Sequence, residues 1–229
     1  MTIVYKSNSI TITKNKKNDF VLSYEDDNYK HFWSNTISQL ESYKQSQTKT
    51  QKQAFFNAYS IEPLTELLKI KKNLLSYRHA MLLFLCIGDQ LNYLEKDKHS
   101  VLTFDLKDII IINSNADRND SIFLFLNTKK FYPIKDKQIV INNPFNIKNL
   151  FLSPELKNIN SLPAHIPLSS SYYSIAFLIS FCLNNSIIKS NRTFKEFLDH
   201  LTIIRDTKLY FSLIRCLDDK PQNRFYLFI

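Results

Sequence analysis

The stretch Leu102-Thr103-Phe104-Asp105-Leu106-Lys107-Asp108-Ile109-Ile110 carries most of the information about the fold of this 229-residue chain. It places charged residues inside an apolar sequence, and residues 102–113 as a whole are rich in Ile, Phe and Leu, which favours a short strand. A polar turn follows, and residues 122–126 are again apolar, so we expect a pair of strands. Asp105 lies next to the isoleucine-rich residues, where an aspartate either caps a turn or has a chemical role.

Upstream of this stretch, the sequence pattern changes from strands to helices. The first 24 residues alternate apolar and polar in short runs, which predicts two or three strands. Residues 29–43 have helical spacing, and the polar residues 45–53 predict a loop or a frayed extension. Further helices are expected from about Pro63 and over residues 77–94. Trp33, Phe32, Phe55 and Phe56 are expected in the core rather than in a base-stacking surface.

Downstream, four prolines interrupt residues 142–171, so no long helix crosses this segment and we expect an irregular loop. Its tripeptide Asn143-Pro144-Phe145 is more simply a chance sequence than a peptide-docking motif. Three helices are predicted after it, over residues 171–184, 193–201 and 208–217. The chain therefore ends in a mainly helical part.

Composition excludes several classes of protein. With 44% hydrophobic and 22% charged residues, the chain is foldable rather than disordered. Gly88 is the single glycine, whereas Walker, dinucleotide-binding and kinase phosphate loops need two or more. The three cysteines and five histidines show no disulfide or metal-binding spacing. We expect no cofactor and no metal.

Charge and hydropathy bear on partners and location. Thirty basic against 21 acidic residues give a net charge of +9, which favours acidic partners, but the lysines are dispersed as an AT-biased coding sequence would disperse them. Nucleic-acid binding therefore stays a less favoured alternative. The longest apolar run, residues 172–183, is shorter than the roughly 20 residues of a membrane span. We expect a soluble, intracellular protein, with its oligomeric state undetermined.

Taken in order, these elements resemble a protein kinase. The resemblance implies an α+β fold with a reduced N-terminal lobe, residues 1–60, and a mainly helical C-terminal lobe, residues 61–229. Asp105 corresponds to the catalytic base of the family's H-R-D-L-x-x-x-N loop, and Lys107 to the lysine that many serine/threonine kinases place two residues later. The match is best beyond about residue 61.

The same resemblance shows losses at the catalytic positions. Thr103 and Phe104 replace the His-Arg pair, and Ile110 replaces the metal-binding asparagine. After residues 122–126, where the family has D-F-G, the sequence is Asn127-Thr128-Lys129, without aspartate or glycine. Asp105 and Lys107 are thus expected to be remnants without catalytic function.

The sequence resembles the structural motifs of the family more closely than its catalytic motifs. Ser153-Pro154-Glu155 is similar to the A-P-E element, and residues 171–176 lie where the family has D-x-W-S-x-G at the start of its central helix. Arg224 lies after Pro221, in a sequence similar to the family's closing helix and loop. The resemblance implies a buried ion pair between Glu155 and Arg224.

The resemblance implies a catalytically inactive kinase-like protein, a pseudokinase, that binds a protein partner as a scaffold or regulator. Its composition, which is typical of an AT-rich coding sequence, and its reduced N-terminal lobe resemble those of divergent kinase-like proteins of large DNA viruses. This resemblance would place the protein in the host cytoplasm. Two alternatives stay open: a degenerate but active serine/threonine kinase that uses Asp105 and Lys107, and a basic nucleic-acid-binding protein.

Overall fold

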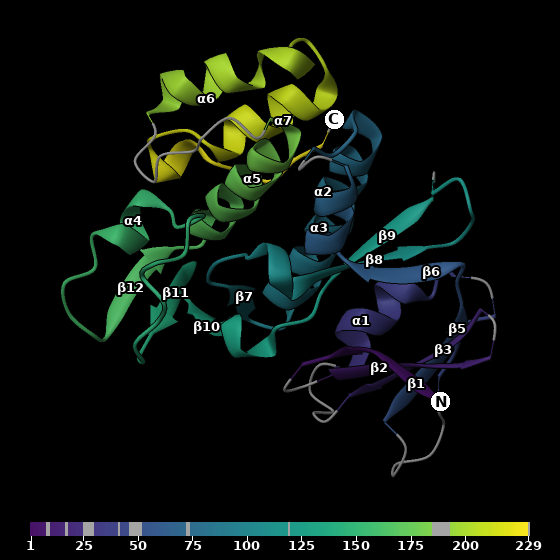
Figure 1. The fold of residues 1–229 in the computed structure, drawn as a ribbon. Coiled ribbons are helices and arrows are strands. Elements are labelled where there is room, and N and C mark those ends of the chain that lie inside the picture. Colours follow the sequence, from purple (N-terminus) through teal and green to yellow (C-terminus); the bar gives the residue numbers. More distant parts are fainter. Residues whose placement is uncertain are drawn as a thin grey trace.

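The computed structural model describes residues 1–7, 10–16, 18–24, 30–40, 42–45, 52–71, 74–118, 120–184 and 193–228. The fold is α+β, with an antiparallel sheet at the N-terminal end and a layer of helices at the other (Figure 1). Parts of two predicted segments, residues 29–43 and 45–53, lie outside the described residues.

The N-terminal sheet has five strands in the order β1-β2-β3-β5-β4, all antiparallel. The strands predicted for the first 24 residues are confirmed as three. The strands are β1 (Thr2–Lys6), β2 (Ile10–Lys16), β3 (Asp19–Tyr24), β4 (Lys44–Gln45) and β5 (Gln53–Asn57).

Helix α1 (Lys30–Ile37) connects β3 to β4 and ends earlier than predicted. The chain turns after Ile37, where the Ser38 hydroxyl donates to the Asn35 carbonyl at 2.8 Å, and then enters the sheet. Trp33 is buried, as predicted, and its indole nitrogen donates to the carbonyl of Phe125 at 2.9 Å.

The other aromatic residues predicted for the core are Phe32 on α1 and Phe55 and Phe56 on β5. Phe32 and Phe56 are buried, but the prediction for Phe55 is wrong, because alternate residues of a strand face opposite sides and Phe55 is 37% exposed.

The second sheet confirms the predicted strand pair. Strands β6 (Ser60–Pro63), β8 (Ile109–Asn113) and β9 (Ser121–Phe125) pair in the order β6-β8-β9. The strand predicted from residue 102 begins only at Ile109, because the backbone N–H of Phe104 donates to the Ser174 hydroxyl and residues 106–108 form a 3₁₀ turn. Helices α2 (Leu64–Ile70) and α3 (Tyr77–Lys96) follow β6, close to the predicted positions.

The third sheet has the order β12-β11-β10-β7. It consists of β7 (His99–Val101), β10 (Phe131–Lys135), β11 (Gln138–Ile141) and β12 (Ala164–Pro167). Residues 142–153 are irregular, as predicted, but α4 (Pro154–Lys157) and β12 are regular elements within the proline-rich segment. A small core of aliphatic side chains, including Ile139, Leu156 and Ile166, lies beneath this sheet.

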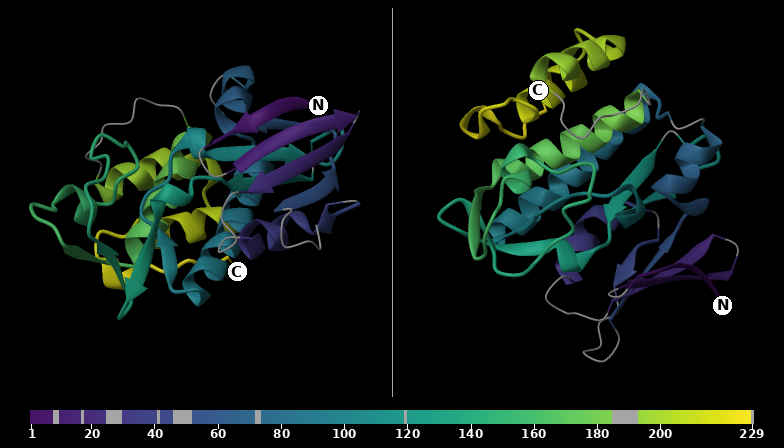
Figure 2. Two further views of the ribbon diagram at one scale, coloured as in Figure 1. Left: turned by 90° about the horizontal axis from the view of Figure 1, so that it is seen from below. Right: turned by 60° about the vertical axis from the view of Figure 1, so that its left-hand side comes forward.

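The helices α5 (Ser169–Leu183), α6 (Phe194–His200) and α7 (Lys208–Cys216) confirm the three predicted for the end of the chain. Helix α5 packs between α3 and α7, whereas α6 and α7 lie at the end of the molecule opposite the N-terminal sheet (Figures 1 and 2). One continuous core extends from Ile12 in β2 to Leu213 in α7. None of the helices in the described ranges is long and apolar enough to cross a membrane.

Candidate functional site

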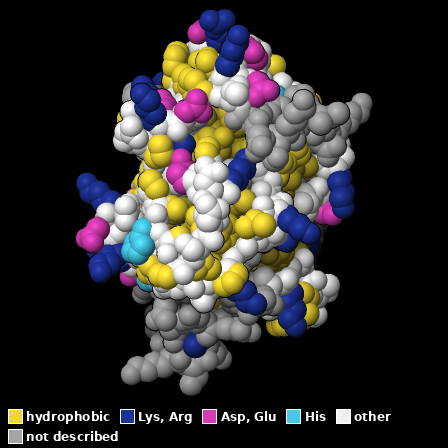
Figure 3. Space-filling view, turned by 90° about the vertical axis from the view of Figure 1, so that its left-hand side faces the viewer, with side chains coloured by type: hydrophobic (Ala, Val, Ile, Leu, Met, Phe, Trp, Pro, Cys, Tyr) yellow, Lys and Arg dark blue, Asp and Glu magenta, His cyan; other side chains and the backbone are white. Residues whose placement is uncertain are grey.

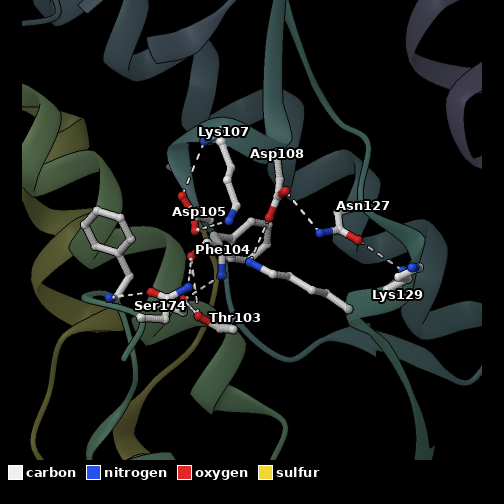
Figure 4. Close-up of polar contacts among 11 residues, drawn as sticks. Thr103, Phe104, Asp105, Lys107, Asp108, Asn127, Lys129 and Ser174 are labelled. Atoms are coloured by element: carbon white, nitrogen blue, oxygen red, sulfur yellow. Dashed lines mark hydrogen bonds and ion pairs between the residues drawn. The ribbon is translucent and has the colours of Figure 1, made fainter. Parts of the chain in front are cut away.

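The loop between β7 and β8, residues 102–108, is anchored on helix α5 by buried serines (Figure 4). The backbone N–H of Phe104 donates to the hydroxyl of Ser174 at 2.9 Å, and the hydroxyls of Thr103 and Ser174 lie 3.2 Å apart. One turn earlier on α5, the Ser171 hydroxyl lies 2.9 Å from that of Ser100. Buried hydroxyls are stabilising only when they are paired, so these contacts fix the loop at one position on the helix.

Asp105 caps the 3₁₀ turn that follows it. Its Oδ1 accepts a hydrogen bond from the backbone N–H of Lys107 at 3.3 Å, and the Lys107 ammonium lies 3.7 Å from Oδ2. The Lys107 side chain is 69% exposed, so this ion pair contributes little to stability. The structure therefore brings the two predicted remnant residues together, and it gives Asp105 the capping role that its sequence position allowed.

Asp108 forms a second polar cluster that the motif alignment did not assign (Figure 4). Its Oδ1 accepts from the side-chain amide of Asn127 at 3.0 Å, and its Oδ2 lies 2.7 Å from the ammonium of Lys130. Both atoms of the ion pair are shielded from solvent. The contact unites the loop before β8 with the turn after β9, a juxtaposition that sequence spacing alone does not reveal.

Strand β1 lies close to this cluster. Burial, together with the nearby negative charge of Asp108, raises the pKa of Tyr5 to about 12. The Tyr5 phenol therefore stays protonated at neutral pH. The N-terminal sheet thus supplies a neutral side chain, not a charge, within electrostatic range of Asp108.

Glu155 and Arg224 form a bidentate ion pair, with Nη1–Oε2 and Nη2–Oε1 distances of 2.9 and 3.1 Å. Arg224 also donates to the carbonyls of Asp218 and Asp219, and its guanidinium lies over the ring of Tyr173. Its side chain has no exposed surface. These are the two residues that the sequence motifs paired across 69 positions.

The electrostatics of Glu155 follow from two opposing effects. Burial would raise the pKa of the carboxyl, but hydrogen bonds and the positive charge from Arg224 outweigh it and hold the pKa below its ordinary value. Ser170 also donates to Oε2 at 3.1 Å. The glutamate is thus an ionised structural anchor that connects α4 to α5 and to the segment after α7.

The donor set at residues 105–130 does not fit a divalent cation. In the described ranges, no three His, Cys, Asp or Glu side chains gather where they could hold a metal ion. Asp108, the most buried carboxylate of the loop, already has a lysine ammonium as its cation. A hard ion such as Mg²⁺ requires several oxygen ligands, so the geometry supports a closed, neutralised cluster.

The chain matches no known protein-family model, and none of the curated proteins searched is similar to it.

Proposed function

We propose that the protein is a catalytically inactive, protein-kinase-like protein that acts by binding a protein partner. The observation that carries the proposal is the buried ion pair between Asp108 and Lys130. Phosphoryl transfer depends on metal ions that neutralise the phosphates, and here the most buried carboxylate of the loop is already neutralised by the chain's own cation.

The order of elements supports the kinase-like part of the proposal. Three strands, helix α1, a return to the sheet, two helices and the loop of Asp105 follow one another as the resemblance requires. The contact between Glu155 and Arg224, which the resemblance implies, supports the correspondence beyond α4. The serine contacts between α5 and the loop give that loop a rigid platform.

The elements of the N-terminal sheet support the absence of catalysis. Kinases carry the phosphate-contacting lysine on their third strand and its glutamate partner on the following helix. Strand β3, with the sequence Asp-Phe-Val-Leu-Ser-Tyr, has no lysine, and α1 has no glutamate. The connection between β1 and β2, residues 7–9, has no glycine.

A phosphoryl-transfer assay tests the proposal. Wild type and Asp105→Ala would be incubated with radiolabelled ATP and Mg²⁺ or Mn²⁺, with autophosphorylation and a generic protein substrate as readouts. We expect the two proteins to be equally inactive. Transfer by the wild type that Asp105→Ala abolishes would establish the degenerate active kinase instead.

A further inference from the structure

A groove of about 1020 Å³ is lined by Leu168, Ser169 and Tyr172 at the start of α5. The end of α3, the turn between β10 and β11, the junction of β12 with α5 and the segment around Pro221 form its walls. Figure 3 views the molecule from the side on which β12 and α4 lie, and lysine and arginine side chains stand there among apolar ones.

Three exposed lysines line the groove: Lys98, Lys135 and Lys137. None of them belongs to an ion pair found in the part of the chain that the structure describes. The backbone fixes two of them, because the carbonyls of Lys98 and Lys137 accept hydrogen bonds from Ile134 and Leu168 at 2.7 and 3.2 Å. The three ammonium groups are therefore available to a ligand, and the side chains of Lys98 and Lys137 extend from backbone that these hydrogen bonds hold in place.

The other charged groups of the groove are mostly engaged within the protein. Glu95 accepts a hydrogen bond from the hydroxyl of Tyr172 at 2.8 Å, and Arg224 is paired with Glu155. Asp136, at the turn between two of the lysines, is the remaining carboxylate. The first turn of α5 also faces the groove, and the positive end of its helix dipole adds to the potential of the lysines.

We infer that this groove binds an extended acidic segment of a protein partner, an inference that rests on the proposed function. The lysines match carboxylates in charge, and Ile134, Pro167 and Pro221 offer apolar walls for side chains between them. A single-stranded nucleic acid requires aromatic platforms for its bases. Tyr172 is the one aromatic residue among those lining the groove, and its hydroxyl is held by Glu95.

The test uses fluorescence anisotropy with a labelled peptide of about ten residues, which spans about 33 Å when extended, with alternating glutamate and valine. The same peptide with glutamine in place of glutamate is the ligand control. The triple variant Lys98→Gln, Lys135→Gln and Lys137→Gln is compared with Lys44→Gln, Lys148→Gln and Lys195→Gln. These control lysines are exposed and lie on other elements, so both variants lose the same charge.

We expect the groove variant to weaken binding of the glutamate peptide about tenfold and the control variant about twofold or less. Gln222→Glu, which adds a carboxylate to the groove wall, should also weaken binding. Equal losses in both triple variants, or binding of the glutamine peptide as tightly as the glutamate peptide, would overturn the inference. Tighter binding of a single-stranded oligonucleotide than of the peptide, lost in the groove variant, would overturn it in favour of nucleic acid.

This outcome is separable from that of the proposed function. If the protein neither binds the peptide nor transfers a phosphoryl group, the inference about the groove is overturned and the proposed function is not. Phosphoryl transfer dependent on Asp105 overturns the proposed function, whatever the groove binds.

Discussion

The loop of Asp105 and the pair of Glu155 with Arg224 differ in how firmly the protein holds their charges. Asp105 is partly exposed and pairs at 3.7 Å with an exposed surface lysine. Glu155 makes two hydrogen bonds to an arginine with no exposed surface, which is itself satisfied by two carbonyls. The contrast teaches that the buried pair connects the helical elements, whereas Asp105 only caps a 3₁₀ turn.

Breaking the better-held pair should have the largest effect. Arg224→Met leaves the Glu155 carboxylate in a largely buried site without its partner, which should reduce the free energy of unfolding by about 3–5 kcal/mol. Urea denaturation would measure this loss, with the exposed Arg205→Met as the control. Equal, small losses in both variants would mean that the pair does not anchor the fold.

The comparison becomes sharper at two lysines, Lys107 in the loop before β8 and Lys130 in the turn after β9. Lys130→Met strands the Asp108 carboxylate, which keeps only the Asn127 amide, and should cost about 1–3 kcal/mol of unfolding free energy. Lys107→Met removes an exposed pair and should cost less than about 1 kcal/mol.

A second substitution checks the cause of that loss. Adding Asp108→Asn to Lys130→Met removes the unpaired charge and should recover part of the stability in urea denaturation. No recovery would show that the Lys130 side chain stabilises by packing alone.

A smaller effect is expected at Gly88, where α3 meets the C-terminal segment. A Cβ at this position would lie 2.5 Å from the ring of Tyr226, which stacks on Phe84 with ring centroids 4.1 Å apart. Gly88→Ala should therefore destabilise by about 1 kcal/mol, the strain exceeding the gain in helix propensity. A double-mutant cycle measures the contact: in a Tyr226→Ala background the same substitution should stabilise, and a loss in both backgrounds would contradict the steric explanation.

The smallest expected effect is in the pH dependence. Because folding lowers the pKa of Glu155, its contribution is fully present above the unfolded value of about 4.3 and is lost as the pH falls through the folded pKa. Unfolding free energies measured from about pH 6 to about pH 3 should fall more steeply for wild type than for Glu155→Gln. Parallel curves would show that the carboxylate has the same pKa in the folded and unfolded states.

Much of the helical part was predictable because its signals are local. Helices α3, α5 and α7 have long apolar faces, and the first strands alternate over short distances. The hairpin of β10 and β11 was not predicted, since Pro133 within β10 argues against a strand. Pro133 is tolerated because β10 changes partner there, from β7 to β11.

The candidate site also contains residues that could be predicted from the sequence and residues that could not. Asp105, Lys107, Glu155 and Arg224 were found from motif order along the chain. The pairing of Asp108 with Lys130 and Asn127 was missed, because it depends on how two turns approach each other after the strands pair. The groove lysines come from separate elements, Lys98 after α3 and Lys135 and Lys137 at the hairpin, and in sequence they are indistinguishable from dispersed surface charge.

The most direct test of the central claim is a thermal-shift titration with ATP, with and without Mg²⁺ and Mn²⁺. Any ligand that binds the native state preferentially raises its apparent stability. With Asp108 neutralised by Lys130 and no lysine on β3, we predict no change in Tm at millimolar nucleotide, with or without metal. A metal-dependent rise in Tm would contradict the claim, because it would require a nucleotide site built from other residues.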